Sequence, residues 1–361
     1  MVQQLQALLP LPYYLTSFSA LDRYFRRPYG QNLYVTVRGS LVDLARLHGE
    51  LEYPGAEDWD AALPSGEGHI YYRCIEDSAD FARFGFAVLD LLFDPRADTF
   101  YDRSDAYQLL RATDLPAGSS DNPATFWEAA VLSARYGYSI EGLETPPREA
   151  LRTTPVDAQR RSLIDILCGS YAWKGLRRLM NHGAVEALWP ELQPMNGTVH
   201  SKEEHPEGNV WQHSLETLRY RKANDLTLTM ALLLHDAGKP YARKTRDRAF
   251  DKHAEIGART AVSLLRRLKF SQQFIDDVAW LVRNHMLPGN LHRLPTYRSE
   301  KAMASPLFPL LLELYRCDLS STYRGPDGYY RACKVYRSFL KHQSNPFRAA
   351  DGKKLLKLYV E

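Results

Sequence analysis

The apolar run from Leu226 to Leu234 has the length of a short helix and leads into an adjacent histidine and aspartate, His235 and Asp236. Gly238 and Pro240 follow at once and stop the pattern, because glycine and proline end helices. The run therefore predicts a buried helix that carries an imidazole and a carboxylate at its C-terminal end. Burying these two groups is costly unless they find partners, and a metal ion is the obvious one.

The N-terminal third follows a different pattern, in which short β-like runs surround one stretch of helical spacing. The β-like runs are Leu33–Val37, Ile70–Tyr72 and Phe86–Leu89, and the helical stretch is Leu41–His48. This order predicts a small mixed α/β domain that ends near Leu110. Residues 160–192 then have the spacing of amphipathic helices. We therefore expect an α+β protein, with a small mixed α/β head followed by an all-α neck and an all-α C-terminal domain.

Further potential metal ligands lie on or beside apolar helical stretches in the C-terminal half. They are His213, His253, His285 and Asp318, about one for each helix. Helical bundles build metal sites in this way, from side chains of facing helices that project into the core. The pattern therefore predicts a metal centre made of imidazoles and carboxylates.

The order of these residues resembles the HD superfamily of metal-dependent phosphohydrolases. It is more similar still to the HD domain of bacterial class II tRNA nucleotidyltransferases and poly(A) polymerases. The segment from His205 to His213 resembles their HPEG-x-VW-x-H signature, and His235 to Pro240 resembles their HD-x-GKP signature. The resemblance covers the chain from roughly Asp157 to Asp318 and rests on an ordered set of ligands.

The resemblance implies a centre for one or two divalent ions, which would be Mn, Fe, Ni, Co or Mg. The ligands of the first ion would be His213, His235, Asp236 and Asp318, and those of the second His253 and His285, with Asp236 bridging. Two such ions can share a hydroxide, aim it at phosphorus and stabilise the leaving oxygen. Lys239 lies one helical turn after His235 and is expected to contact a phosphate oxygen. Asp236 and Lys239 are thus the expected catalytic residues.

The N-terminal segment resembles the nucleotidyltransferase head of the same enzymes, but several charged positions differ. Asp58 and Asp60 match the DxD pair that holds magnesium, and we regard them as a residual magnesium site. Positions at which the family has arginine or aspartate are occupied here by Val42 and Gly85 in the head and by Thr125, Glu128 and Val131 in the neck. A glutamate in place of an arginine reverses its interaction with phosphate. We therefore expect a catalytically degenerate head that binds nucleoside triphosphates poorly.

The expected domains are a degenerate nucleotidyltransferase-like head at residues 1–110 and a helical neck at residues 111–200. The HD phosphohydrolase domain would occupy residues 201–345, and residues 346–361 would form a truncated C-terminal segment. Longer family members continue here into a tail that grips tRNA. Its absence is a further reason not to expect processing of tRNA ends.

Composition changes this picture little. The 361 residues are 45% hydrophobic with a net charge of +3, so overall charge does not by itself predict nucleic-acid binding. The four cysteines form no CxxC pair, which argues against a zinc site of the finger type. The chain has neither the features of a signal peptide nor an apolar run of about 18 residues. We expect a soluble cytoplasmic protein without a membrane partner.

These features favour a metal-dependent phosphohydrolase, a phosphodiesterase or phosphatase. It would act on nucleotides or on RNA-end phosphates such as 2′,3′-cyclic or 2′-phosphates. Two alternatives stay open. One is a tRNA nucleotidyltransferase (CCA-adding) or a poly(A) polymerase, which the Asp58 and Asp60 pair favours. The other is a non-catalytic RNA-binding module with a structural metal. The expected partner is a nucleotide or RNA-end phosphate, with tRNA itself as a further candidate, and the sequence does not define the oligomeric state.

Overall fold

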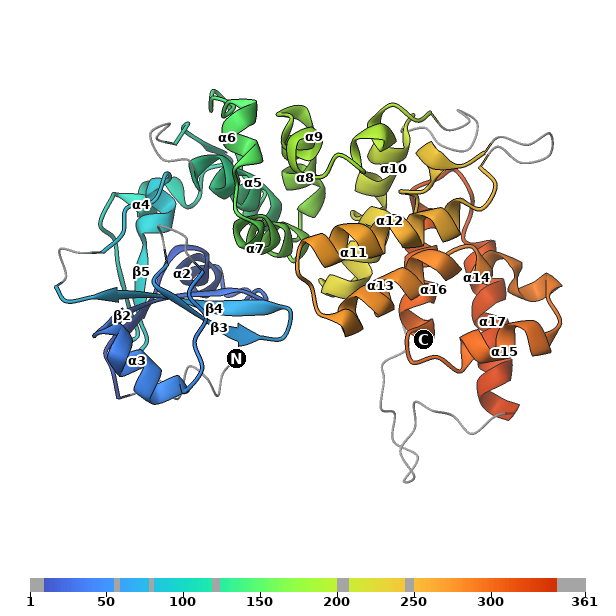
Figure 1. Cartoon of the computed structure of the whole chain (residues 1–361), viewed down its shortest axis with the longest axis horizontal. Coiled ribbons are helices and arrows are strands. Elements are labelled where there is room, and N and C mark those ends of the chain that lie inside the picture. Colours follow the sequence, from blue (N-terminus) through green and yellow to red (C-terminus); the bar gives the residue numbers. More distant parts are fainter. Residues whose placement is uncertain are drawn as a thin grey trace. The chain divides into compact units, whose positions relative to one another are not determined.

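The computed structural model describes residues 10–54, 59–77, 81–118, 124–199, 208–243 and 250–342 (Figure 1). The chain forms two compact units, Met1–Leu188 and Trp189–Glu361. The first contains a six-stranded sheet with helices, and the described part of the second is helical, with only isolated β-bridges. The predicted α+β class is therefore confirmed. Among the described residues, no helix is both long enough and apolar enough to cross a membrane.

The sheet of the first unit has the strand order β3-β4-β2-β1-β5-β6. Its strands are β1 (Tyr13–Leu15), β2 (Leu33–Arg38), β3 (Ala61–Ser65), β4 (Gly68–Ile75), β5 (Leu92–Asp94) and β6 (Thr99–Tyr101). Strands β2 and β4 run parallel, with Leu33 opposite Ile70, and the other neighbouring pairs are antiparallel. The first five residues of β2 are all buried, as expected for a strand covered on both faces.

Helix α3 (Leu41–His48) follows β2 after a tight turn, as the sequence predicts. The Ser40 side chain accepts a hydrogen bond from the Asp43 backbone N–H, and the Asp43 carboxylate accepts one from the Ser40 backbone N–H. This reciprocal pair satisfies two N–H groups that a helix start otherwise leaves unpaired. The motif Gly39-Ser40 is thereby fixed at the end of β2.

The predicted β-like run Phe86–Leu89 is wrong, because the structure has a 3₁₀ turn there, η2 (Ala87–Asp90). The Asp90 carboxylate accepts hydrogen bonds from the Phe84 backbone N–H and from the Ser104 hydroxyl. These contacts come from residues before and after the run and favour a turn. Short apolar runs are ambiguous between strand and buried turn when only periodicity is available.

The remaining helices of the first unit form one layer against the sheet and one bundle beyond it (Figure 1). They are α2 (Ser17–Tyr24), α4 (Ala106–Leu109), α5 (Ala124–Tyr136), α6 (Arg148–Arg152), α7 (Val156–Leu167), α8 (Ala172–Asn181) and α9 (Ala184–Leu188). A two-stranded parallel sheet joins β7 (Asp114–Leu115) to β8 (Ser139–Ile140). Helix α5 is almost entirely buried, and α8 packs closely on it through Gly175, where a Cβ would overlap the Ala130 carbonyl.

A buried group of charges links three of these helices. Arg135 of α5 forms ion pairs with Asp22 of α2 and with Asp165 of α7. All three side chains are at most 6% exposed. Tyr136 also donates a hydrogen bond to Asp22, and Tyr34 of β2 donates one to Asp165. Burial raises the pKa of Asp165 to about 6, although Arg135 and the hydrogen bond from Tyr34 lower it.

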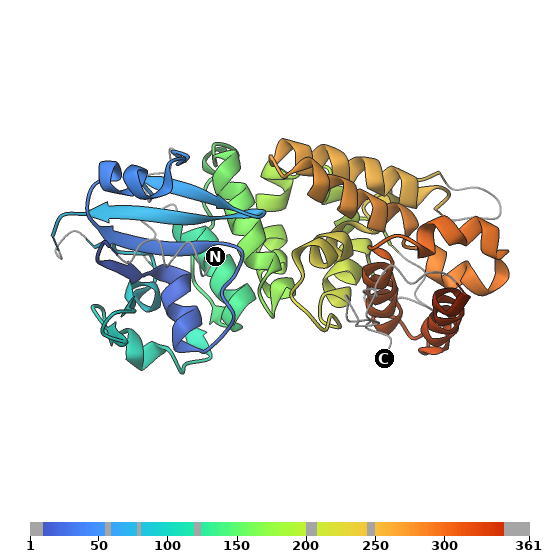
Figure 2. The same cartoon turned by 90° about the horizontal axis from the view of Figure 1, so that it is seen from below.

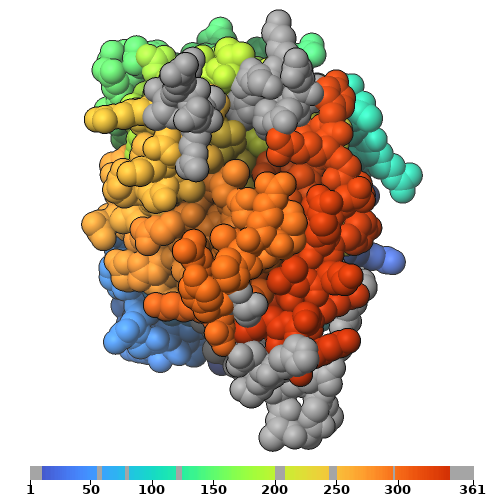
Figure 3. Space-filling view, turned by 90° about the vertical axis from the view of Figure 1, so that its right-hand side faces the viewer, coloured from blue at the N-terminus to red at the C-terminus, as the bar shows by residue number. Residues whose placement is uncertain are grey.

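The second unit is a helical bundle around α11 (Leu226–Leu234), which matches the predicted helix residue for residue (Figure 2). The Asp225 side chain caps its N-terminus by accepting from the Leu228 N–H. The other elements are η3 (Gln193–Asn196), α10 (Val210–Thr217), η4 (Lys239–Tyr241), α12 (His253–Arg267), α13 (Gln272–Asn284), α14 (Leu287–Asn290), η5 (Leu291–Arg293), α15 (Thr296–Met303), α16 (Phe308–Ser320) and α17 (Asp327–His342). Figure 3 shows one face of this unit in orange and red.

Candidate metal centre and ligand pocket

Five helices of the second unit bring the six predicted metal ligands together. His213 lies in α10, Asp318 lies in α16, and His253 begins α12. His235 and Asp236 directly follow α11, and His285 directly follows α13. Every one of the six except His253 and Asp318 is at most 2% exposed. Residues far apart in the sequence therefore converge inside one bundle core.

Two glycines allow this convergence. Gly238, in the turn after α11, lies against the first turns of α12, and a Cβ there would overlap the His253 carbonyl and the Gly257 N–H. A Cβ on Gly257 would lie 3.1 Å from the Gly238 nitrogen. The two backbone segments therefore touch without intervening side chains, which places His253 beside Asp236.

The ligand atoms form two groups of three, each with all its atoms within 4.8 Å of one another. The first group is His213, His235 and Asp318, and the second is Asp236, His253 and His285. Asp236 lies between them. Its Oδ2 is 3.4 Å from His235 Nε2 and 3.7 Å from His213 Nε2, whereas its Oδ1 is 3.6 Å from His253 Nε2 and 3.8 Å from His285 Nε2. One carboxylate oxygen thus faces each group.

The imidazoles point lone pairs into this space. The Nδ1 atoms of His235, His253 and His285 each lie within 2.9 Å of a backbone carbonyl oxygen, so each Nδ1 donates and each Nε2 is left unprotonated. The Nε2 atoms of His253 and His285 are 3.2 Å apart, which is unfavourable for two lone pairs without a cation. His235 Nε2 is buried and has no hydrogen-bond partner among the described residues. The donor set therefore fits a divalent ion.

The protonation states of the cluster suit metal binding. Burial lowers the pKa of His285 to about 4, with His235 adding to the effect, so this imidazole is neutral at neutral pH. Burial tends to raise the pKa of Asp236, but Lys239 and His235 outweigh it and hold that pKa well below its usual range. Burial is likewise outweighed at Asp318, whose pKa is lowered mainly by the hydrogen bond and charge of His213. His285 is thus a neutral imidazole and both aspartates are ionised, and these are the forms of the two groups that bind metals.

Lys239 has a partner within the cluster. Its Nζ lies 2.6 Å from Asp236 Oδ2, and its side chain is only 12% exposed. The ammonium group thus neutralises part of the buried carboxylate charge, a role that the sequence spacing did not predict. Its predicted contact with a phosphate stays a prediction. Of the signature residues, His205 lies outside the described residues.

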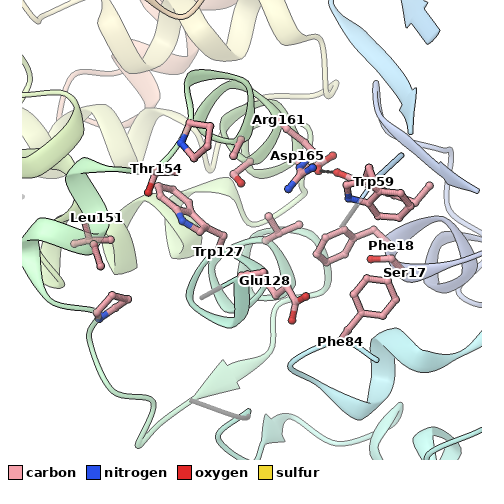
Figure 4. A pocket seen from close by; sticks show the side chains of 18 of the residues that line it. Ser17, Phe18, Trp59, Phe84, Trp127, Glu128, Leu151, Thr154, Arg161 and Asp165 are labelled. Atoms are coloured by element: carbon pink, nitrogen blue, oxygen red, sulfur yellow. Dashed lines mark hydrogen bonds between the residues drawn. The ribbon is translucent and has the colours of Figure 1, made fainter. Parts of the chain in front are cut away.

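The first unit contains a cavity of about 470 Å³ between the sheet and the helices α5, α6 and α7 (Figure 4). One wall consists of Trp59, Phe18 and Phe84, and the opposite wall includes Trp127 and Leu151. Its polar lining includes Glu128, Asp165, Arg161 and several hydroxyl groups. Such a size and a mainly apolar lining with few polar groups are typical of small-molecule sites.

Altered positions of the head and the neck pack against one another at the edge of this cavity. Glu128 Oε2 accepts a hydrogen bond from the Gly85 backbone N–H at 2.9 Å. The Thr125 side chain lies so close to Gly85 that any Cβ at position 85 would overlap it. Gly85, where the related enzymes have an aspartate, therefore packs directly against Thr125, where they have an arginine. Val131 also lines the cavity, whereas Val42 is exposed on α3.

Asp60 lies just before β3 and is exposed, with its Oδ2 accepting a hydrogen bond from the Cys74 N–H at 2.7 Å. The neighbouring Trp59 points into the cavity wall and is buried. Asp58, the other predicted magnesium ligand, lies outside the described residues.

Sequence reasoning did not predict the cavity residues Trp59, Trp127 and Arg161. Arg161 lies on α7 with its guanidinium carbon 5.2 Å from the centre of the Tyr71 ring, and it is the only cation that lines the described cavity. The available sequence signal was that Arg161 and Asp165 lie four residues apart, which places them on the same face of a helix. Only the packing of α7 on the sheet shows that this face meets a cavity.

Comparison with known proteins agrees with these features. The family described as HD domain matches residues 209–313. The chain is 30% identical over 248 residues to the A-adding tRNA nucleotidyltransferase of Deinococcus radiodurans, covering 61% of this chain and 54% of that protein. It is 31% identical over 147 residues to the CC-adding tRNA nucleotidyltransferase of Thermus thermophilus, covering 38% of this chain and 32% of that protein. This chain thus spans about half or less of each relative.

The chain has an HD domain and is homologous to tRNA nucleotidyltransferases. Its fold is similar to that of the CCA-adding enzyme of Bacillus stearothermophilus in complex with CTP, with a TM-score of 0.52. That match has 14% sequence identity and covers 93% of this chain and 81% of the other. These relatives support an enzyme, and the HD domain together with the ligand cluster supports dependence on a divalent metal.

The expected phosphohydrolase activity is wrong in the light of these relatives, whose names describe nucleotide addition to tRNA. The physical reason is that the ligand cluster specifies which ions can bind and does not specify the reaction. One fold with one kind of metal site can serve different activities. The comparisons instead favour the first of the two alternatives.

Proposed function

We propose that this chain is a nucleotide-adding enzyme that acts on the 3′ end of tRNA. The observation that carries the proposal is the similarity to the A-adding tRNA nucleotidyltransferase. Because 61% of this chain is more than either compact unit contains, that similarity reaches into both units. A similarity confined to the HD domain would not favour this function.

The first unit offers a place for the reaction. Gly39-Ser40 is fixed between β2 and α3, and the exposed Asp60 carboxylate lies at the start of the neighbouring β-hairpin. Asp60, together with Asp58, would hold a magnesium ion, which neutralises phosphate charge when bound. The cavity beside Trp59 has aromatic walls on which a nucleobase can stack.

Charges in the cavity determine how tightly a nucleotide binds. Arg161 supplies the guanidinium donors for phosphate or base oxygens, whereas the Glu128 carboxylate repels phosphate. Since α5 offers Thr125, Glu128 and Val131 in place of cations, we expect a high KM for nucleoside triphosphates. Glu128→Gln should keep the hydrogen bond to the Gly85 N–H, remove the repulsion and lower that KM.

The test is incorporation of labelled AMP or CMP into tRNA that lacks its 3′-terminal nucleotides, with magnesium present. Wild-type protein should add nucleotide, and Asp60→Asn should reduce kcat by about two orders of magnitude or more, as loss of a charge-stabilising catalytic group does. The matched control is Asp98→Asn, an exposed carboxylate that pairs with Arg23 in the same unit. Absence of nucleotide addition by the wild type, or full activity of Asp60→Asn, would refute the proposal.

For the cluster we propose one or two divalent ions. The first would be held by His213, His235, Asp236 and Asp318, and the second by His253, His285 and Asp236. The two oxygens of the Asp236 carboxylate face different ligand groups, which supports this division. Metal analysis of purified protein should find at least one ion per chain, and Asp236→Asn should lose it. Metal-free wild-type protein after reconstitution with manganese would contradict the assignment.

A further inference from the structure

An open groove of about 520 Å³ lies on the surface of α12 and α13. Its lining consists of Arg259, Val262, Ser263, Arg266, Arg267 and Arg283, so four of its six residues are arginines and none is acidic. The whole chain carries a net charge of only +3. The groove therefore carries a local excess of positive charge that the net charge of the chain does not reveal. We call it the arginine groove.

Helix geometry explains why these arginines meet. Arg259, Ser263 and Arg266 are spaced by four and then three residues along α12, which places them on one face. Helices α12 and α13 lie side by side (Figure 2). The Val282 side chain lies 3.3 Å from the point where a Cβ of Gly257 would be, so Arg283 stands beside the first half of α12. The two helices therefore present their arginines to the same groove.

Most of this charge is not neutralised within the protein. Arg267 forms an ion pair with Glu191 at 2.6 Å. Arg259, Arg266 and Arg283 are exposed and form no ion pair within the described part of the chain. Asp276 of α13 accepts a hydrogen bond from the Gln272 amide and forms no ion pair with these arginines among the described residues. Like charges that share a groove repel one another, so a bound anion would lower the energy.

The chemistry of the groove favours a phosphate backbone. Guanidinium groups bind phosphate oxygens through two parallel hydrogen bonds. Arg259 and Arg266 are seven residues apart, about 10 Å along the helix axis, which spans roughly three phosphates of a helical strand. The groove has no aromatic side chain on which a base could stack. No large hydrophobic side chain of the described α12 and α13 is exposed, so insertion into a membrane has no support.

We propose that the arginine groove binds the phosphate backbone of RNA without reading its sequence. Naming tRNA as that RNA rests on the proposed function, whereas the groove itself rests on charge and geometry alone. The contacts would hold the body of the RNA against the second unit. Because such contacts carry no base specificity, they position the RNA and do not select it.

The test compares RNA binding by the full chain and by the triple variant Arg259→Gln, Arg266→Gln, Arg283→Gln. Fluorescence anisotropy with a labelled tRNA that lacks its 3′ end is measured over a range of potassium chloride concentrations. Each lost phosphate contact should reduce the slope of log K against log salt by about 0.7–0.9, so the triple variant should lose about 2–3 in slope. At low salt its affinity should fall about tenfold or more.

The matched control is Arg293→Gln, Lys301→Gln, Arg331→Gln, which removes the same charge from exposed residues of the same unit outside the groove. We expect its affinity to change less than about twofold. An unchanged slope in the groove variant, or an equal loss in the control, would overturn the proposal. The proposal would also be overturned if inorganic phosphate at millimolar concentration and constant ionic strength displaced the RNA. The same holds if the groove variant lost binding to phosphatidylserine vesicles but kept wild-type binding of RNA.

The proposed function fails separately from the groove. If the wild type adds no nucleotide, RNA binding and its salt slope still decide whether the groove is real. If the groove variant keeps wild-type binding while the wild type adds nucleotide, only the groove is refuted. When both hold, the variant should show a raised KM for tRNA with little change in kcat, because Arg259, Arg266 and Arg283 lie outside the nucleotide cavity.

Discussion

Substituting Gly238 by alanine should damage one half of the metal centre more than the other. The backbone at Gly238 is right-handed, with φ −84° and ψ −15°, so alanine is conformationally allowed there. The obstacle is steric, because the added Cβ would overlap the His253 carbonyl and the Gly257 N–H. Both are backbone groups and cannot rotate away. The start of α12 must therefore move, and His253 moves with it.

The magnitude follows from two opposing effects. Overpacking against backbone costs about 1–3 kcal/mol. Replacing glycine by alanine restricts the unfolded chain and returns about 0.4–1 kcal/mol. The net loss should be up to about 2.6 kcal/mol, with about 2–4 °C of Tm per kcal/mol for a unit of this size. His253 lies 3.6 Å from Asp236 Oδ1 and 3.2 Å from His285, so a small shift breaks the second ligand group. His213, His235 and Asp318 do not lie on α12, so the first group should be disturbed less.

The assay is metal analysis after reconstitution with manganese, together with thermal unfolding of the full chain. Gly238→Ala should bind less metal than the wild type and unfold at a lower temperature. Gly325→Ala is the matched control, because a Cβ at Gly325 meets nothing within 4 Å. If Gly238→Ala keeps the wild-type Tm and metal content, the close contact between the turn and α12 does not determine the position of His253.

Two further predictions concern buried charge. Unfolded His285 takes up a proton near its usual pKa, and folded His285 only near a pKa of about 4, so the unfolded chain binds more protons between these values. The stability of metal-free protein should therefore decrease as pH falls through that window, by up to about 3 kcal/mol, and urea unfolding of His285→Gln should show a flatter profile; equal profiles would be inconsistent with a neutral buried imidazole. Arg135→Met should lower the free energy of unfolding by about 3–5 kcal/mol, because Asp22 and Asp165 would stay buried without the cation that pairs with both. The exposed Arg152→Met should change it little, and a loss below about 1 kcal/mol in Arg135→Met would contradict the assigned role.

The elements that the sequence predicts well carry strong local signals. Helix α11 is mainly apolar and is bounded by a capping aspartate and by Gly238, and its observed bounds equal the predicted ones. Helix α3 likewise begins at the Ser40 capping box. Strands β1, β5 and β6 have only three residues each and depend on pairing with distant strands, so their local sequence gives little indication of them.

The cluster shows the same division. Residue types and helical spacing were sufficient to predict which six side chains converge. The orientation of the two Asp236 oxygens depends on how α10, α12 and α13 pack, which no local pattern encodes. The pairing of Lys239 with Asp236 is local, because the two residues lie three positions apart. The reaction was beyond the sequence for a different reason, because a ligand set determines ion affinity and leaves the chemistry to the substrate site.

The Asp22–Arg135–Asp165 group has a consequence for the assembly of the first unit. Asp22 belongs to the N-terminal part of the unit, whereas its cation and second acid come from helices more than a hundred residues later. A polypeptide that stopped near Leu110 would have to bury Asp22 alone or leave α2 undocked. The sheet and the helices α5 and α7 are therefore expected to fold cooperatively, so that head and neck gain and lose their structure in a single transition.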